Sequence, residues 1–159
     1  MIHTLTVPLS LDAAFDSFVD LSQWWPRDYT FSKDVLVSVT IEPHGDGHCY
    51  ELGPHGFRCD WGRVIAWEPP HRLGLLWQLG PSNRPEPDPE KASDVEVRFH
   101  PEGAGTRVTL EHREFERHGD GCERLRTEMD SENGWPKILA DYAAYAARAS
   151  SGVPMTAPA

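Results

Sequence analysis

Between residues 34 and 112 the chain repeats short segments in which apolar and polar residues alternate, and glycines and prolines separate these segments. Alternation with a period of two is typical of β-strands that bury one face. From about Asp120 to Ala149 the spacing of the apolar residues becomes helical. Because a run of strands is flanked by helices instead of alternating with them, the order predicts an α+β fold with an antiparallel sheet.

The alternation also assigns residues to the two faces of each strand. We expect a first strand, then a run of about six strands, the last two forming a hairpin. The predicted strands cover residues 2–9, 34–43, 48–52, 57–70 and 71–80, and a hairpin covers residues 94–112. One face of the second strand carries Val35, Val37, Val39 and Ile41. One face of the fifth strand carries Leu73, Leu75, Trp77 and Leu79.

Two helical regions flank the strands. Ser10 is placed to cap a helix over residues 11–20, and the segment "LSQWW" adds one more short turn before Pro26. In the last region, Pro136 lacks a backbone donor. We therefore expect it either to kink the long helix or to mark the start of its second half.

Length and charge exclude several classes of protein. The 159 residues fit one domain over residues 1–149, and the small, proline-containing segment 150–159 is expected to be disordered. A net charge of -10 argues against nucleic acids and anionic membranes as partners. Three cysteines without a CxxC pair and an N-terminus unlike a signal peptide favour a cytoplasmic location.

Four segments, taken together, resemble the START-like, or polyketide-cyclase-like, superfamily. Within it, the chain is similar to the branch named after the activator of the heat-shock-protein ATPase. The resemblance covers roughly residues 2–149, and the segments that carry it are "PLSLDAAFDSFVDLSQWW" (8–25), "WGRVIAWEPPHRLGLLW" (61–77), "VEVRFHPEGAGTRVTLEHREF" (95–115) and "GWPKILADYAAY" (134–145).

The resemblance implies a helix-grip fold. The antiparallel sheet is expected to curve around the long C-terminal helix and to leave an apolar cavity between them, closed at one end by short helices that follow the first strand. Members of the superfamily bind lipids, hormones or polyketides, and some catalyse cyclisation or dehydration. No cofactor is implied.

The adjacent Trp24 and Trp25 raise the question of whether they wall this cavity or fill the core. We expect one to be buried and the other to line the opening. Strand parity places further side chains inside, although Arg63 and a possible bulge at Gly62 make residues 57–67 ambiguous. The candidate ligand-binding residues are Trp24, Trp25, Phe31, Tyr50, Phe57, Trp61, Trp77, Phe99, His112, Phe115, Trp135 and Leu139.

His112 is the most informative polar candidate, because it continues the apolar face formed by Val108 and Leu110. It could orient a ligand oxygen or act as a general base. The alternative is a half-solvated histidine at the end of a strand. If the chain is an enzyme, His112 and Glu51 are the candidate acid/base groups.

Other catalytic and metal-binding patterns are weak, and no catalytic residue or metal ligand is assigned. His44, His48, Cys49, His55 and Cys59 cluster only loosely, and adjacent strand residues point to opposite faces. No nucleophile motif surrounds a serine, and no glycine-rich motif precedes a helix.

Three functions remain open at this point. The first is binding of a small hydrophobic or aromatic molecule without catalysis, by a monomer or homodimer. The second is a cyclase- or dehydratase-like lyase that acts on a hydrophobic substrate. The third is a protein-interaction module that resembles a chaperone cofactor. The aromatic content favours the first.

Overall fold

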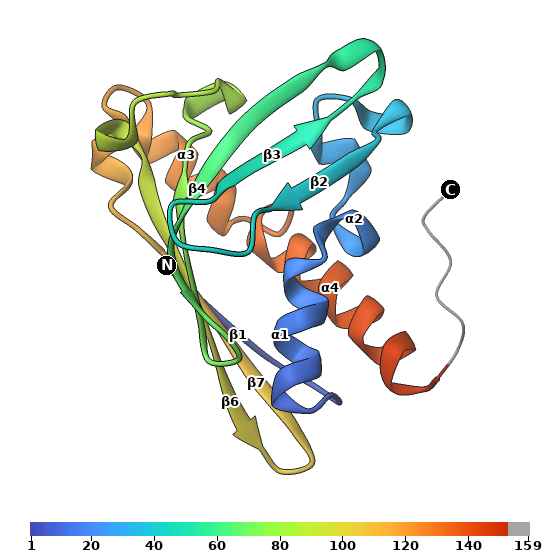
Figure 1. Ribbon diagram of the computed structural model, residues 1–159. Helices are drawn as coiled ribbons and strands as arrows, with labels where there is room; N and C mark the ends of the chain where they lie inside the picture. Colours follow the sequence, from blue (N-terminus) through green and yellow to red (C-terminus); the bar gives the residue numbers. More distant parts are fainter. Residues whose placement is uncertain (153–159) are drawn as a thin grey trace.

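The computed structural model describes residues 1–152 and contains one seven-stranded antiparallel sheet, ordered β1-β7-β6-β5-β4-β3-β2 (Figure 1). The predicted α+β fold and the run of six strands after the first are confirmed. The strands are β1 (Ile2–Val7), β2 (Ser38–Ile41), β3 (His48–Leu52), β4 (Arg58–Glu68), β5 (Arg72–Trp77), β6 (Ser93–Glu102) and β7 (Gly105–Arg113).

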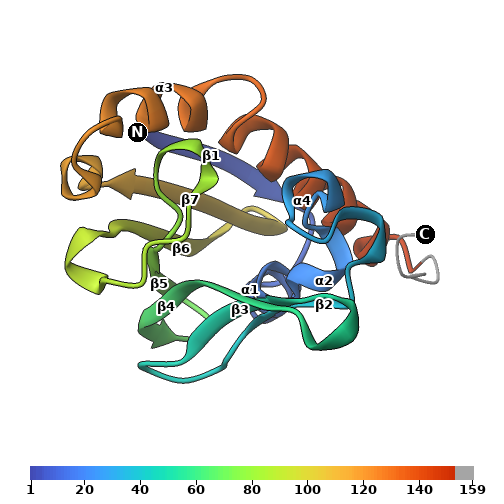
Figure 2. The same cartoon turned by 90° about the horizontal axis from the view of Figure 1, so that it is seen from above.

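The helices α1, α2 and α4 lie on the concave side of this sheet. Seen from above, the sheet curls so that β2, β3 and β4 form one side and β1, β7 and β6 the other (Figure 2). The helix α4 packs against β1, α2 against β2 and α1 against β6, as a helix-grip fold requires. The helices are α1 (Leu11–Val19), α2 (Leu21–Trp24), α3 (Cys122–Asp130) and α4 (Trp135–Ser150), with short 3-10 turns that include η1 (Arg27–Tyr29), η2 (Lys33–Val35), η4 (Pro81–Asn83) and η6 (Phe115–His118).

The first helix forms where its cap predicts. The hydroxyl oxygen of Ser10 accepts a hydrogen bond from the backbone N–H of Ala13, 3.3 Å away. Phe15 and Phe18 are buried on the inner face of α1 and pack against Phe99 of β6. This aromatic group fixes α1 against the sheet.

The last helical region is two helices and not one. The chain turns between α3 and α4, and Gly134 lies so close to the end of α3 that a Cβ there would meet the carbonyl oxygen of Met129 at 2.2 Å. Pro136 lies in the first turn of α4, where a missing N–H costs nothing. Of the two alternatives for Pro136, the start of the second helix is correct.

The edge strand β2 is shorter than the alternation predicted. Val35 belongs to η2 and Val37 precedes the strand, and both side chains are more than half exposed, at 61% and 65%. Only Val39 and Ile41 are buried, because the strand begins at Ser38. The hydroxyl of Ser22 donates to the Val39 carbonyl and accepts from its N–H, which closes this part of the sheet edge.

The hairpin of β6 and β7 agrees with its prediction. Val97 lies opposite Leu110 and Phe99 opposite Val108, and all four side chains are fully buried. The strand β7 is followed by η6.

No helix among residues 1–152 is both long enough and apolar enough to span a bilayer. Residues 150–159 were expected to form a disordered tail. Ser150 is the last residue of α4, and residues 153–159 lie outside the described part of the chain.

Candidate ligand pocket

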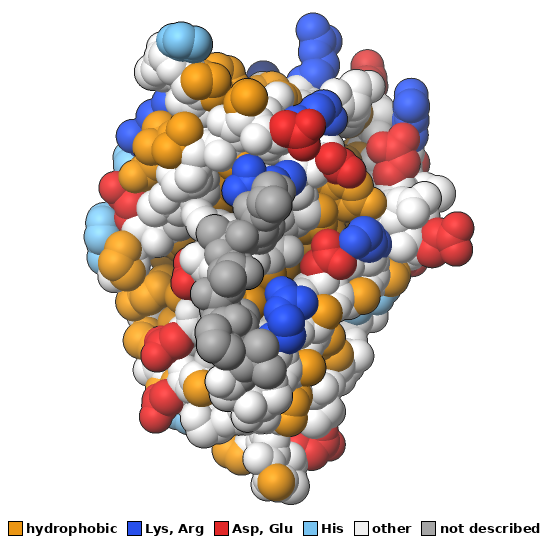
Figure 3. Space-filling model, turned by 90° about the vertical axis from the view of Figure 1, so that its right-hand side faces the viewer, with side chains coloured by type: hydrophobic (Ala, Val, Ile, Leu, Met, Phe, Trp, Pro, Cys, Tyr) orange, Lys and Arg blue, Asp and Glu red, His pale blue; other side chains and the backbone are white. Residues whose placement is uncertain are grey.

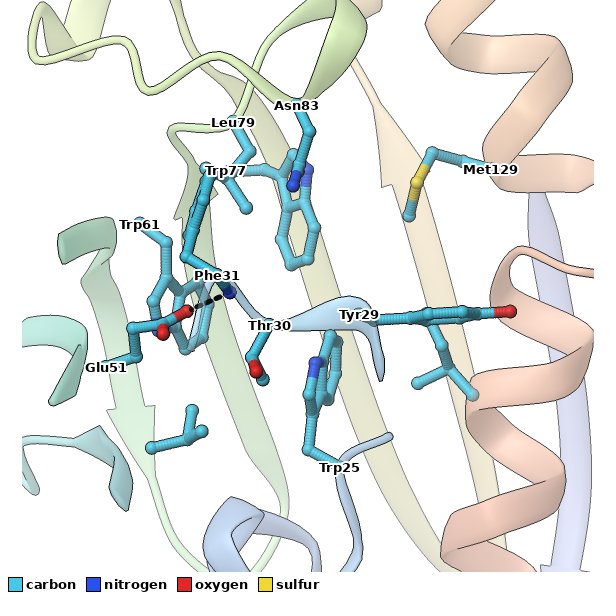
Figure 4. A pocket seen from close by; sticks show the side chains of 12 residues that line it. Trp25, Tyr29, Thr30, Phe31, Glu51, Trp61, Trp77, Leu79, Asn83 and Met129 are labelled. Carbon is cyan, nitrogen blue, oxygen red and sulfur yellow. Dashed lines mark hydrogen bonds between the residues drawn. The ribbon is translucent and has the colours of Figure 1, made fainter. Parts of the chain in front are cut away.

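A cavity of about 270 Å³ opens between the sheet and the segment that links α2 to β2 (Figure 4). This volume is near the lower end of small-molecule sites, which begin at roughly 300 Å³. Apolar and aromatic side chains dominate its wall. The lining residues are Trp25, Tyr29, Thr30, Phe31, Val39, Glu51, Trp61, Trp77, Leu79, Asn83, Met129 and Ile138.

Trp25 lies at the centre of a cluster of five tryptophans. Its ring is nearly parallel to that of Trp61, with 17° between the planes and 6.4 Å between the centroids. It also contacts Trp77 at 6.3 Å and, edge to face, Trp135 at 6.3 Å. Trp24 completes the cluster at 5.7 Å from Trp25. The pocket is therefore walled by several ring faces from different elements.

The two adjacent tryptophans have different environments. Trp24 is buried in the core, where its indole N–H donates to the carbonyl oxygens of Ser17 and Phe18 at 3.1 and 3.0 Å. Trp25 is half-buried and faces the pocket. The structure thus places one tryptophan in the core and the other at the cavity wall.

Glu51 supplies the pocket's carboxyl group. It lies on β3, and its side chain is buried. Its Oε1 accepts from the backbone N–H of Phe31 at 2.9 Å, and its Oε2 accepts from the N–H and the hydroxyl of Ser32 at 3.0 and 2.8 Å (Figure 4). These three bonds fasten the 27–35 segment to the sheet and so hold one wall of the pocket in place.

Trp61 reaches the pocket through an irregularity in the sheet. Cys49 pairs with Gly62 while Tyr50 pairs with Asp60, so Trp61 is an extra residue on β4. The predicted irregularity near Gly62 therefore exists, and Trp61 faces inward as expected. Its buried indole nitrogen has no hydrogen-bond partner among the residues that the structure describes.

His112 is fully buried and does not line the pocket, so the alternative of a half-solvated strand-end histidine is wrong. Its Nδ1 accepts from the indole N–H of Trp135 at 3.0 Å, and its Nε2 lies 2.7 Å from the hydroxyl of Ser93. Ser93 in turn lies 2.8 Å from Nε2 of His118. An indole nitrogen can only donate, so His112 must be neutral, with its proton on Nε2.

Burial also keeps His112 neutral. Desolvation, helped by the charges of His118 and the chain's amino terminus, lowers the pKa of His112 to about 3. Both ring nitrogens already have partners, so neither is free to take a proton from a ligand in this arrangement. The structure therefore gives His112 a role in holding Trp135, which stands behind Trp25 and Trp77.

Two of the expected site residues, Phe57 and Tyr50, are neither in the pocket wall nor in the core. Phe57 precedes β4 and is 43% exposed, since the strand begins only at Arg58. Tyr50 alternates with Glu51 and therefore points to the opposite face of β3, where its ring lies under the guanidinium of Arg58 at 3.9 Å. The expectation that Phe57 faces inward is wrong, and Tyr50 does not reach the cavity.

The remaining expected residues divide between the pocket wall and the core. Trp25, Phe31, Trp61 and Trp77 line the cavity, although Phe31 is also 40% exposed at its mouth. The buried residues that pack behind the wall or elsewhere in the core are Trp24, Phe99, His112, Phe115, Trp135 and Leu139.

Several lining residues were not among the candidates. Val39 and Leu79 had been placed only on apolar faces of their strands, Met129 lies on α3, and Tyr29, Thr30 and Asn83 come from short turns between the main elements. Tyr29 also donates its hydroxyl to the carbonyl oxygen of Asn133 at 2.8 Å, which ties η1 to the turn before α4. No sequence periodicity marks such loop positions, although Trp25 and Phe31 of the same segment were among the candidates.

The histidines and cysteines of the first half form no recognisable centre. Within residues 1–152 no three His, Cys, Asp or Glu side chains are arranged to hold a metal ion. Burial, with Glu42 and Asp60 nearby, raises the pKa of the Cys49 thiol to about 12. A thiol of this kind is a poor nucleophile.

A second hollow, more polar than the first, lies on the other side of the α2–β2 segment. It is bordered by Arg27, Asp34, Lys137 and Arg148, among others. On the face shown in Figure 3, Lys and Arg side chains lie among Asp and Glu side chains. Such a mixed surface does not offer the single-sign patch that phosphate backbones require.

Comparisons with known proteins agree with this architecture. Residues 13–147 match the family described as Activator of Hsp90 ATPase homolog 1-like protein. No curated protein matches the chain. Among solved structures, an anthrahydroquino-gamma-pyrone synthase, Txn09, complexed with SUM, is 33% identical with a TM-score of 0.64, and the match covers 91% of this chain and 94% of that one.

Two further structures illustrate the range of similarity. The self-sacrificing resistance protein CalC from Micromonospora echinospora is 28% identical with a TM-score of 0.61, over 92% of each chain. Protein NE0264 from Nitrosomonas europaea is 16% identical with a TM-score of 0.64, over 92% of each chain, and supports the fold alone.

Proposed function

This chain belongs to the Activator of Hsp90 ATPase homolog 1-like family, and we propose that it binds a small, planar aromatic molecule in the tryptophan-lined pocket. The observation that carries the proposal is the set of ring faces that Trp25, Trp61 and Trp77 present around one cavity. Aromatic rings stack favourably on such faces and gain more than the buried area alone provides.

The similar structures support an aromatic ligand. Txn09 is described as a synthase of an anthrahydroquino-gamma-pyrone, a polycyclic aromatic product, and the chain is 33% identical to it. The cavity here is small, at about 270 Å³, so a ligand larger than two or three fused rings would extend through the mouth beside Phe31. Partial exposure of the ligand is compatible with binding through stacking.

Tryptophan fluorescence provides the test. Three of the six tryptophans line the cavity, so a bound ligand should quench or shift the emission in a saturable way. The panel should contain fatty acids, sterols, flavonoids and aromatic polyketides, and Trp25→Ala should weaken the response. The matched control is Trp67→Phe, because Trp67 packs on Phe15 away from the pocket. No saturable change with any compound would argue against the proposal and favour an interaction role.

A second candidate function is ring-forming catalysis, which the 33% identity to a synthase favours. Among the pocket's lining residues only Glu51 carries a carboxyl group, so it is the candidate acid or base. His112 is not a candidate, because both of its ring nitrogens are engaged. Mass spectrometry after incubation with aromatic polyketide precursors would detect turnover. Product formation that Glu51→Gln leaves unchanged would exclude this role for Glu51.

A further inference from the structure

Glu51 is held in the pocket wall without a cationic partner. Its side chain is 4% exposed, and its three hydrogen bonds all come from the neutral donors of Phe31 and Ser32. No basic nitrogen of residues 1–152 lies within the 4.0 Å of its oxygens that defines an ion pair. A buried carboxylate normally has such a partner, because removing it from water is costly.

The field of Glu51 extends beyond these bonds. Burial raises the pKa of the Cys59 thiol, and the negative charge of Glu51 raises it further. Cys59 lies directly opposite Glu51 on the neighbouring strand. The acidic neighbour Asp60 acts in the same direction. The negative charge of Glu51 thus acts on its neighbour on the adjacent strand, Cys59, and Asp60 is itself paired with Arg58 at 2.7 Å.

Glu51 also has an unused acceptor position. A carboxylate offers about four lone-pair sites to donors. Oε2 accepts two hydrogen bonds and Oε1 accepts one, from Phe31. One site on Oε1 is thus left for a donor. Figure 4 shows the carboxyl group at the cavity wall formed by β3 and β4, on the same side as Trp61.

The aromatic wall favours the same kind of partner. The faces of Trp25, Trp61 and Trp77 carry the negative part of the ring quadrupole, which attracts cations, and tryptophan is the strongest of the aromatic residues in this respect. The lining contains no lysine, arginine or histidine that would compete. The carboxyl group and the ring faces together complement a positively charged group.

We propose that the ligand of this pocket carries an ammonium group on an aromatic body, with the ammonium donating to Glu51 and the rings stacked on the tryptophans. This inference rests on the proposed binding function and specifies its ligand class. A neutral ligand would leave the Glu51 carboxylate without a cationic partner, and the carboxylate would repel an acidic ligand. Charge, and not ring shape alone, then determines which aromatic molecules bind.

Three naphthalenes that differ in one substituent test the proposal on the wild-type protein. They are 1-naphthylmethylamine, positively charged at neutral pH, the neutral 1-naphthylmethanol and the anionic 1-naphthoate. A hydrogen bond between charged groups should make the amine bind about tenfold to hundredfold more tightly than the alcohol. The acid should bind most weakly. Affinities can be measured by calorimetry at pH 7 and low salt.

The possible outcomes separate the two claims. Equal affinity for amine and alcohol would overturn the ammonium preference while supporting an aromatic pocket. Failure of all three compounds to bind would overturn both. Tighter binding of the acid would require a cationic group in the site and would likewise overturn the proposal.

A variant tests whether Glu51 causes the preference for the amine over the alcohol. Glu51→Gln places an amide against the donor of Phe31, so its folding must be verified by circular dichroism. In a folded variant the amine's advantage over the alcohol should fall to less than about threefold. Glu42→Gln is the matched control, since Glu42 also accepts a backbone N–H, from His48, but does not line the pocket. Retention of the full preference in Glu51→Gln would contradict the assignment.

Discussion

The indole N–H of Trp135 donates to Nδ1 of His112 over 3.0 Å, and both side chains are buried. The bond joins the first residue of α4 to β7, and it sets the direction of the hydrogen bonds that follow. His112 donates to Ser93, and Ser93 donates to His118. A chain of hydrogen bonds thus runs from Trp135, in the tryptophan cluster, to the half-buried His118.

Replacing His112 with alanine should destabilise the fold. The change leaves the Trp135 N–H without an acceptor and opens a cavity, which together should cost about 3 kcal/mol or more. Urea unfolding at pH 7 measures the loss. His100→Ala, an exposed histidine on β6, is the control and should change the free energy of unfolding by less than about 0.5 kcal/mol. Equal losses in both variants would show that the buried network contributes nothing.

Acidification should destabilise the protein through His112. Its folded pKa is about 3 against an ordinary value of 6.5, so between these values the unfolded chain takes up a proton that the folded protein does not. The free energy of unfolding is therefore fully retained above about pH 6.5 and falls as the pH drops, by at most about 1.4 kcal/mol per pH unit. Burial lowers the pKa of His118 as well, which acts with the same sign.

The pH effect can be isolated by comparing variants between pH 5 and 7. Burial acts to raise the pKa of Glu96, but hydrogen bonds from three arginines hold this pKa at about 2. The contribution of Glu96 to the free energy of unfolding is therefore lost only at lower pH. His112→Gln should show a smaller decrease in stability than the wild type over this range, and His100→Ala the same decrease as the wild type. A His112→Gln profile parallel to that of the wild type would contradict the assignment.

The adjacent tryptophans should respond differently to substitution. Trp24→Ala removes a core side chain and two indole hydrogen bonds to backbone carbonyls, so it should cost about 3–5 kcal/mol. Trp25→Ala should cost less, because Trp25 is half-buried, but it should weaken binding of 1-naphthylmethylamine. Urea unfolding and calorimetry distinguish the two. A larger stability loss for Trp25→Ala would refute the division of roles.

Glu51 should control the mobility of the segment over the pocket. Glu51→Ala removes the acceptor for the backbone N–H groups of Phe31 and Ser32. Their amide hydrogen exchange should accelerate about tenfold to hundredfold, while amides of β6 and β7 change far less. Exchange followed by NMR provides the measurement. Uniform acceleration over the whole sheet would indicate global destabilisation instead.

Alternation in the sequence predicted the interior of the sheet well. The inward positions of Val97, Phe99 and Leu110 follow from period two, because these strands are central and one face must be buried. The resemblance then supplied the arrangement of sheet and helix. The predicted hairpin at residues 94–112 is confirmed for the same reason.

Prediction failed at the ends of strands and for contacts between distant residues. Phe57 and Val37 belong to the alternating pattern but lie just before the first residues of β4 and β2, where the pattern does not define the strand's end. The buried network of His112 depends on Ser93 and Trp135, two residues that are far apart in sequence. Long-range hydrogen bonds of this kind leave no periodic signal.

The most direct test of the account is an NMR titration. The protein is labelled with 15N in its tryptophan indoles, and 1-naphthylmethylamine is added to it. The indole signals of Trp25, Trp61 and Trp77 should shift in a saturable way, and that of Trp67 should remain in place. Tryptophan-to-phenylalanine variants assign the signals. Saturable shifts at Trp67 without shifts at the three pocket tryptophans, or no shifts at all, would contradict the claim that this cavity is a binding site.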